Sequence, residues 1–338
     1  MVLAAIAGPR LHSAEATAAR NDPKSLIALG RALFFDTSIG ADGKTGCVSC
    51  HSPDHGFAEP RAVAVGVFGH KGSRNTPSLL ALPDDGPFFW DGRRTTLEDA
   101  VLDPIVHPSE LGLTSVTEVT KRMNTRVYRS LAEKAFGLRD ISSLSHEQIA
   151  LALATFIRTM PRPAVPFDHY YDGHDDRAMD RESLEGYRLF VGKAGCVACH
   201  SMQGHPVKFS DDAFHPTGTG FEHLADDLPR LTHDVSDASI SPSDIGRLVA
   251  GRRDLAATGR FVVTHRAADV GLFRTPSLRH VAETAPYMHD GSVGTLEEAV
   301  DQEVYWRSLS QGKSLSLTVD ERASLIAFLR SLSNEPSH

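Results

Sequence analysis

The chain lacks the features that would place it in a membrane or on a nucleic acid. No apolar run reaches the ~18 residues that a membrane-spanning helix requires. Its 35 Lys and Arg are outnumbered by 43 Asp and Glu, which gives a formal charge of −8, and no long basic run is present. Clustered basic side chains bind phosphate backbones, so nucleic acid is excluded as a partner. With 338 residues, 41% of them hydrophobic, the chain is long enough for about two globular domains.

Cysteine is also scarce, and the four cysteines fall into two pairs with the same context. Residues 47–51 read Cys-Val-Ser-Cys-His, and residues 196–200 read Cys-Val-Ala-Cys-His. This is the attachment signature of c-type haem, in which two thiols bond to the porphyrin and the adjacent histidine binds iron. The candidate haem-binding residues are Cys47, Cys50 and His51 for one haem and Cys196, Cys199 and His200 for a second.

Two other uses of a Cys-x-x-Cys pair fit less well. A zinc ribbon needs its second pair about 15–20 residues after the first, whereas Cys50 and Cys196 are 146 positions apart. A thioredoxin-like redox pair needs a βαβ context, which is not present. Because haem is attached covalently outside the bacterial cytoplasm, the motifs predict a periplasmic protein. Residues 1–20 are Ala-rich but lack the charged N-terminal region of a complete signal peptide. They are interpreted as the remnant of a trimmed signal peptide or as an expression start.

The sequence repeats itself once. Three motifs occur in both parts of the chain: residues 30–34 resemble 186–190, residues 76–79 resemble 275–278, and residues 96–101 resemble 295–300. The last two pairs share an offset of 199 positions, in which Trp90 aligns with His289. We therefore expect two homologous domains with one haem each, residues 21–165 and 166–338, joined through the segment 162–181.

The patterning indicates an all-α fold of two cytochrome c-like domains with long loops. Residues 146–160 and 320–332 have apolar residues at three-to-four spacing, which is typical of amphipathic helices. Four hydroxyl residues are expected to be helix N-caps: Thr96, Ser145, Thr295 and Thr318. Segments 52–71 and 201–257 show little periodicity and are expected to be loops around the haem edges.

Further motifs accompany the haem signatures, at residues 29–36, 74–78 (Arg-Asn-Thr-Pro-Ser), 89–93 (Phe-Trp-Asp-Gly-Arg), 273–279 and 285–291 (Ala-Pro-Tyr-Met-His-Asp-Gly). Together they cover roughly residues 25–335. With these motifs the chain resembles the bacterial di-haem cytochrome c peroxidases, including the MauG-type branch.

The resemblance implies roles for four residues. His51 would bind the iron of an N-terminal, peroxide-reducing haem, and His200 the iron of a C-terminal, electron-transferring haem. Glu110 matches the distal carboxylate that moves a proton between the two peroxide oxygens, an exposed loop glutamate being the alternative. Trp90 matches a tryptophan between the two haems, with a core tryptophan as the alternative.

The resemblance also implies a structural calcium. Asn75 would supply a side-chain oxygen, and Thr284 and Pro286 would supply backbone carbonyls; the alternative is a pair of turns that Asn75 alone stabilises. Many members carry a histidine near His70 that binds the resting peroxidatic haem. The spacing here is shorter than in that pattern, so an exposed loop histidine is the preferred interpretation of His70.

The sixth ligand of the second haem departs from the family pattern. Members place Met, or Tyr in the MauG-type branch, 14 residues after the histidine that matches His289. That count reaches Glu303, whose counterpart in the first half is Pro104, and a two-residue insertion would place Tyr305 there instead. Haem chemistry favours Tyr305, because phenolate is the commoner ligand. Either oxygen ligand implies a low reduction potential for the second haem, as in MauG-type proteins.

The sequence thus predicts a periplasmic di-haem peroxidase. Hydrogen peroxide would be reduced at the haem of His51, with oxidising equivalents shared through Trp90 in MauG-like high-valent chemistry. Electrons would come from a small redox protein or from a protein substrate. The alternative is a non-catalytic di-haem electron-transfer cytochrome c, which would need neither Glu110 nor Trp90.

Overall fold

The computed structural model describes residues 22–334, apart from residues 81, 84–85, 124, 222–223, 225–226, 237–240, 311 and 313. The segment 1–20, interpreted above as a leader remnant, lies outside the described residues. The described chain is helical, with one pair of short strands, so the all-α prediction is confirmed. None of its helices is both long enough and apolar enough to cross a membrane.

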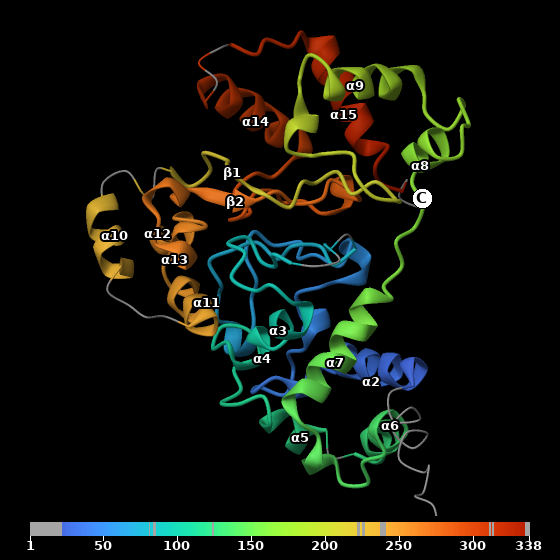
Figure 1. Cartoon of the computed structure of the whole chain (residues 1–338), viewed down its shortest axis with the longest axis vertical. Coiled ribbons are helices and arrows are strands. Elements are labelled where there is room, and N and C mark those ends of the chain that lie inside the picture. The colour runs from blue at the N-terminus through green and yellow to red at the C-terminus, as the bar shows by residue number, and fades with distance from the viewer. Residues whose placement is uncertain are drawn as a thin grey trace, which may run out of the picture.

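Two halves lie one above the other, and their loops face each other across the middle of the molecule (Figure 1). The first half contains α2 (Pro23–Phe35), α3 (Leu97–Ala100), α4 (Asp103–Val106), α5 (Glu118–Arg122), α6 (Arg126–Phe136) and α7 (His146–Arg158). The second half contains α8 (Pro166–Tyr171), α9 (Arg181–Val191), α10 (Leu228–Ser236), α11 (Pro242–Ala250), α12 (Arg253–Ala257), α13 (Phe261–Thr264), α14 (Leu296–Ser310) and α15 (Val319–Arg330). In the second half, β1 (Phe214–Pro216) pairs with β2 (Leu272–Arg274) in antiparallel orientation.

The predicted helix starts are confirmed. Each of the four expected N-caps accepts a hydrogen bond at 3.1–3.3 Å from the backbone N–H three residues later: Thr96, Ser145, Thr295 and Thr318. A capping hydroxyl satisfies one of the N–H groups that a helix start leaves unpaired. The two predicted amphipathic helices correspond to α7 and α15.

In each half a glycine lets the helix that precedes the haem motif cross closely against the last helix. A Cβ added to Gly30 of α2 would lie 1.9 Å from the carbonyl oxygen of Ala152 in α7. A Cβ added to Gly186 of α9 would lie 1.8 Å from the carbonyl oxygen of Ser324 in α15. No larger residue fits at either crossing. Because the two glycines are equivalent in the repeat, both halves are built on the same helix pair.

The halves meet through two backbone hydrogen bonds that are counterparts of each other under the repeat. The N–H of Asn75 donates to the carbonyl of His289 at 2.8 Å, and the N–H of Arg274 donates to the carbonyl of Trp90 at 2.9 Å. Asn75 and Arg274 are 199 positions apart, and so are Trp90 and His289. Mutual exchange of this kind is the pattern of a twofold-symmetric interface. The chain therefore folds as an internal dimer of its two halves.

The second half also carries an insertion, defined here as residues 217–271, between β1 and β2. It contains α10 to α13 and lies beside the first half in Figure 1. Its helices share an apolar cluster of their own, whose buried members are Leu224, Leu231, Val235, Ile245, Val249, Leu255, Ala256, Ala257, Phe261 and Val262. The two main cores draw on residues 26–160 and 165–332. The domain boundary at residue 165 stays a prediction.

The expectation that segment 201–257 is a loop is therefore wrong for much of its length. Helices α10, α11 and α12 fall within it, and a local signal for α11 is present in the sequence. Ser241 accepts from a backbone N–H as the N-cap, and Pro242 occupies the first helical position. Ile245 and Val249 then lie one turn apart on the buried face.

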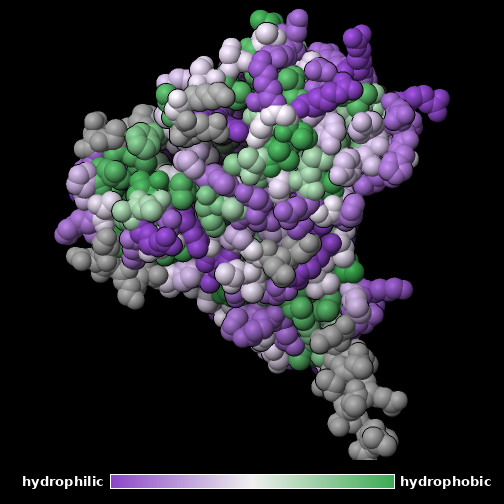
Figure 2. Space-filling view, turned by 45° about the horizontal axis from the view of Figure 1, so that its top comes forward, coloured by the Kyte–Doolittle hydropathy of each residue, from purple (hydrophilic) through white to green (hydrophobic). Residues whose placement is uncertain are grey.

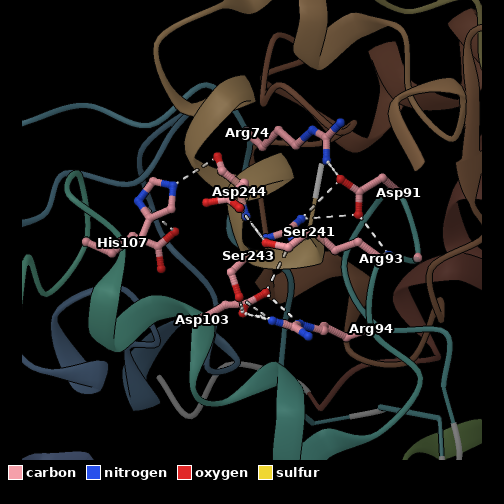
Figure 3. A network of polar contacts seen from close by, with 12 residues as sticks. Arg74, Asp91, Arg93, Arg94, Asp103, His107, Ser241, Ser243 and Asp244 are labelled. Atoms are coloured by element: carbon pink, nitrogen blue, oxygen red, sulfur yellow. Dashed lines mark hydrogen bonds and ion pairs between the residues drawn. The ribbon is translucent and has the colours of Figure 1, made fainter. Parts of the chain in front are cut away.

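A buried polar network joins the insertion to the first half (Figure 3). Asp91 has no exposed surface, and it pairs with Arg74 at 2.5 Å and with Arg93 at 3.1 Å. Arg74 also donates to the carbonyl of Ala256 in α12 at 3.0 Å. Burial alone would raise the pKa of Asp91, but the guanidinium groups of Arg93 and Arg74 lower it to about 2. Asp91 is therefore an ionised, fully paired carboxylate.

A second carboxylate extends this network. Asp103 binds Arg94 through both of its oxygens and accepts a hydrogen bond from Ser243 of α11 at 3.2 Å. Both carboxylates are buried, so solvent screens their ion pairs with the arginines little. On the face of the molecule that Figure 2 shows, hydrophilic and hydrophobic residues are interspersed.

We expect Gly186→Ala to lower the free energy of unfolding by about 2 kcal/mol, because the added methyl overpacks the α9–α15 crossing. Gly251→Ala is the matched control, since a Cβ there meets nothing within 4 Å. Denaturant unfolding of the haem-loaded protein measures both. Equal stability of the two variants would show that the crossing is not tight.

We expect Asp91→Asn to cost about 3 kcal/mol, because two buried arginines lose their shared partner. The folded pKa of Asp91 is depressed from 3.8 to about 2. Its contribution is therefore present above pH ~4 and lost as the pH falls to ~2, and the variant should lack that part of the acid dependence. Asp290→Asn changes the equivalent residue of the second half, which accepts one hydrogen bond from the N–H of Ser292. A cost for Asp290→Asn as large as that for Asp91→Asn would contradict the prediction.

Candidate haem sites

Both Cys-x-x-Cys-His motifs have the same local structure. Residues 47–49 and 196–198 each form one turn of 3-10 helix. The N–H of His51 donates to the carbonyl of Cys47 at 2.9 Å, and that of His200 donates to the carbonyl of Cys196 at 3.0 Å. All four cysteines are free thiols. Each motif therefore presents two thiols and one imidazole from a single compact turn.

The two imidazoles are oriented in the same way. Nδ1 of His51 lies 3.0 Å from the carbonyl oxygen of Phe57, and Nδ1 of His200 lies 3.0 Å from that of Phe209. A carbonyl only accepts, so Nδ1 carries the proton and Nε2 is left with its lone pair. Burial lowers the pKa of both histidines, that of His51 to about 4, so both are neutral at neutral pH. Neutral imidazole with a fixed Nδ1–H is the form that binds a metal.

The residues that provide these carbonyls have an unusual backbone. Phe57 has a φ of 53° and Phe209 a φ of 54°, in the left-handed region that disfavours side chains with a Cβ. Such a conformation costs about 1 kcal/mol or more and is retained where the surrounding structure requires it. Its occurrence at both haem motifs indicates that it serves to aim the carbonyl at the imidazole. Nothing in the sequence marks these two residues, since any residue can offer a carbonyl.

The thiols are protonated and carboxyl groups lie near both pairs. Burial raises the pKa of Cys47 and of Cys50 to about 12; the charge of Glu110 adds to the shift at Cys47, and those of Glu59 and Glu110 add to it at Cys50. Burial raises the pKa of Cys196 to about 11, where Glu303 makes the corresponding contribution. Reduced thiols beside a neutral imidazole are the groups that c-type haem attachment needs, so both motifs fit the cofactor.

Glu110 lies on a loop, residues 107–112, that packs against a hairpin at residues 64–72. The carbonyl of Glu110 accepts from the N–H of Val67 at 2.9 Å, and a Cβ on Gly66 would lie 2.3 Å from the carbonyl oxygen of Ser109. The Glu110 side chain is 33% exposed. A carboxylate on a fixed backbone, partly open to water, can exchange protons with both a bound substrate and solvent.

His70 lies at the exposed tip of the same hairpin. Its Nδ1 is 3.3 Å from the carbonyl oxygen of Pro108, and the neighbouring Phe68 is 68% exposed. This is the environment of a surface histidine, the interpretation preferred from the sequence.

Trp90 lies where the two halves meet. Its carbonyl accepts from Arg274, and its indole Nε1 donates to the carbonyl of Asn75 at 2.9 Å. Asn75 in turn donates to His289. The indole is therefore fixed by the same residues that join the halves. Its role between the haems stays a prediction, with which this position agrees.

The residues predicted around calcium also lie at the interface. The side chain of Asn75 is buried, and its Nδ2 donates to the carbonyl of Ala62 at 3.2 Å, which leaves Oδ1 as the oxygen available to a cation. Thr284 and Pro286 flank Ala285, whose carbonyl lies 2.5 Å from Nε2 of His55. Backbone and amide oxygens suit a hard cation, and calcium stays a prediction.

The two candidates for the sixth ligand point in different directions. Glu303 and Tyr305 are two positions apart on α14, about 200° around the helix. Burial raises the pKa of Glu303 to about 7, and its charge acts on Cys196, whereas Tyr305 is 58% exposed. Helix α14 begins at Leu296, 199 positions after the start of α3 at Leu97, so no residue is inserted between His289 and the start of α14. The ligand to the second haem stays a prediction, for which Glu303 is the less exposed of the two candidates.

Comparison with known proteins gives consistent matches. Residues 24–176 match the sequence family described as di-haem cytochrome c peroxidase. The chain is 34% identical over 316 residues to methylamine utilization protein MauG of Methylorubrum extorquens, covering 92% of this chain and 79% of that protein. It is 35% identical over 320 residues to cytochrome-c peroxidase IdrP1 of Denitromonas iodatirespirans, covering 91% and 81%. The crystal structure of a MauG-like protein associated with microbial copper homeostasis matches with a TM-score of 0.71 at 28% identity, covering 98% and 94%.

Proposed function

The chain belongs to the di-haem cytochrome c peroxidase family, and on that premise we propose that it reduces hydrogen peroxide at the haem of the first motif. One observation carries the proposal: the two motifs hold their histidines identically, while the groups near them differ. The first motif has Glu110 on a loop, and the second has Glu303 within helix α14, where desolvation raises the pKa of Glu303 to about 7. Two haem sites with different surroundings are suited to different tasks, peroxide reduction at one and electron transfer at the other.

A haem held by Cys47, Cys50 and His51 supplies an iron that binds peroxide and passes electrons to it. Glu110 would transfer a proton in this reaction. It would accept the proton from one oxygen of hydrogen peroxide and deliver it to the other, which leaves as water. Complete reduction to two waters takes two electrons and two further protons. The exposed part of the Glu110 carboxyl allows exchange of those protons with solvent.

Cys196, Cys199 and His200 would hold the second haem, and Trp90 would lie on the electron path between the two haems. We propose that the electrons come from a small redox protein or from the side chain of a protein substrate. Because haem is attached covalently outside the bacterial cytoplasm, we propose that the activity is periplasmic. Calcium bound by Asn75, Thr284 and Pro286 would stiffen the interface around Trp90.

We further propose that Glu303 occupies the sixth position of the second haem. Its partial burial and the effect of its charge on the pKa of Cys196 support this assignment, whereas the side chain of Tyr305 is mostly exposed. An oxygen ligand favours ferric iron, in contrast to a methionine ligand, which raises the potential. The second haem should therefore be hard to reduce and well suited to share oxidising equivalents.

Glu110→Gln tests the peroxidase function. Because glutamine cannot accept a proton, kcat/KM for hydrogen peroxide with an artificial electron donor should fall by about 10²- to 10⁴-fold. Glu133→Gln, which changes a glutamate that is 59% exposed on α6, should leave it unchanged. Haem content of each variant is read from the reduced spectrum. Retention of the original rate by Glu110→Gln would argue for a non-catalytic electron-transfer cytochrome.

Glu303→Met and Tyr305→Phe test the sixth ligand. The methionine variant should raise the reduction potential of the second haem and alter its ferric spectrum, because thioether replaces carboxylate. The phenylalanine variant should change neither. Potentiometric titration followed optically measures both effects. A shift in Tyr305→Phe without one in Glu303→Met would reverse the assignment.

A further inference from the structure

Helix α14 carries two redox-active aromatic residues in succession, Tyr305 and Trp306. Their rings meet edge to face, with centroids 5.4 Å apart and an angle of 73° between the ring planes. Successive residues of a helix are about 100° apart around the axis, so Trp306 lies between the side of Tyr305 and the side of Glu303. Tyr305 is 58% exposed, whereas Trp306 is partly buried. The pair therefore leads from the side of Glu303 to the surface.

The side of α14 that carries Glu303 and Trp306 lies beside the second haem motif. Nη1 of Arg307, which follows Trp306, donates to the carbonyl of Ala194 at 2.7 Å, two residues before Cys196. Burial raises the pKa of Cys196 to about 11, and the charge of Arg307 lowers this pKa while that of Glu303 raises it. The residues one position after and one turn before Trp306 thus both lie close enough to act on this thiol.

The indole of Trp306 is fixed in place by the start of the insertion. A Cβ added to Gly218 would lie 2.0 Å from Cδ2 of Trp306, so only glycine leaves room for the ring. The next residue, Thr219, accepts a hydrogen bond from Nε2 of Gln302 on α14 at 2.5 Å. The indole is therefore held between this backbone turn and the ring of Tyr305.

We propose that Trp306 and Tyr305 form an electron path between the second haem and the surface, and that phenolic donors are oxidised at Tyr305. The inference rests on the proposed peroxidase function and extends it to the class of donor. Indole and phenol are side chains that can give up one electron. The positions 199 residues before the pair are Val106 and His107, so the first half has no such pair.

The step balances with hydrogen peroxide as the oxidant. One electron moves from the phenol of Tyr305 through the indole of Trp306, and the phenolic proton passes to water at the exposed ring. The phenoxyl radical then takes a hydrogen atom from the donor phenol, whose O–H bond breaks as that of Tyr305 re-forms. Two such events supply the two electrons and two protons that turn one peroxide into two waters. The products are two oxidised donor radicals.

Radical trapping on the haem-loaded protein tests the path without turnover of a donor. Hydrogen peroxide is added to the diferric protein with a nitroso spin trap, and adducts are located by peptide mass spectrometry. We expect an adduct on Tyr305, and its loss in Tyr305→Phe and in Trp306→Phe. Tyr171→Phe is the matched control and should keep the adduct, because Tyr171 is 38% exposed but its ring stacks on Phe167 and contacts neither tryptophan.

Trp306→Tyr separates electron transfer from packing. Tyrosine and phenylalanine both leave part of the indole's space empty, but only the phenol can be oxidised in place of the indole. The adduct on Tyr305 should therefore return in Trp306→Tyr and stay absent in Trp306→Phe. Equal trapping at Tyr305 in these two variants would overturn the inference, because Trp306 would then carry no electron.

Two donors distinguish a free phenol from the side chain of a protein. We measure kcat/KM for phenol itself and for a peptide that contains one tyrosine, with peroxide in excess. Loss of activity toward either donor in Tyr305→Phe, with the Tyr171→Phe rate unchanged, supports the inference and identifies the source. Unchanged oxidation of both donors by Tyr305→Phe would overturn it.

Failure of the proposed function gives a different result, since neither the unchanged protein nor its variants would then consume peroxide. Consumption of peroxide with no adduct on Tyr305 would overturn the electron path alone. A changed ferric spectrum in Tyr305→Phe would also overturn it, because the phenol would then be a haem ligand.

Discussion

Two reciprocal backbone hydrogen bonds, one from Asn75 to His289 and one from Arg274 to Trp90, set the arrangement of the whole molecule. Each bond is the counterpart of the other under the repeat, so the interface is that of a symmetric dimer formed within one chain. Residues proposed for different tasks converge there. Trp90 is fixed by its carbonyl and indole, and Asn75 donates from its amide nitrogen to Ala62, which leaves its amide oxygen for the proposed calcium. A change at this interface would therefore affect several proposed sites together.

On this symmetric frame, one helix accounts for much of the difference between the haem sites. In the first half Pro104 lies at the start of α4, and the chain turns into the loop that ends near Glu110. In the second half the equivalent residue is Glu303, and α14 continues unbroken to Ser310. Proline is tolerated in the first turn of a helix but not in its interior, so Pro104 is compatible with the start of α4 and not with an unbroken helix like α14. The equivalent stretches therefore differ: the first half has two short helices and a loop with Glu110, and the second half has one continuous helix with Glu303.

The sequence predicts the haem motifs, the repeat and the helix caps because each depends on residues close together in the chain. Ser145 and Thr318, for example, are recognised from the three residues that follow them. The insertion was missed because its helices are short and lie in a Gly- and Pro-containing segment, although Pro242 marks one start. The sequence leaves Glu303 and Tyr305 open as ligands, because their exposure depends on how α14 packs against residues distant in the chain. The contact of His107 with Gly246 joins positions 139 apart and is likewise not visible in the sequence.

The buried ion pairs of Asp91 limit movement of the insertion. Any hinge motion between the insertion and the first half would have to expose the ion pairs of Asp91 with Arg74 and Arg93 and break the bond from Arg74 to Ala256. Such exposure is costly, so the insertion and the first half are expected to move as one body. The insertion is part of the second half, so this network resists separation of the two halves as well as the backbone bonds between them do.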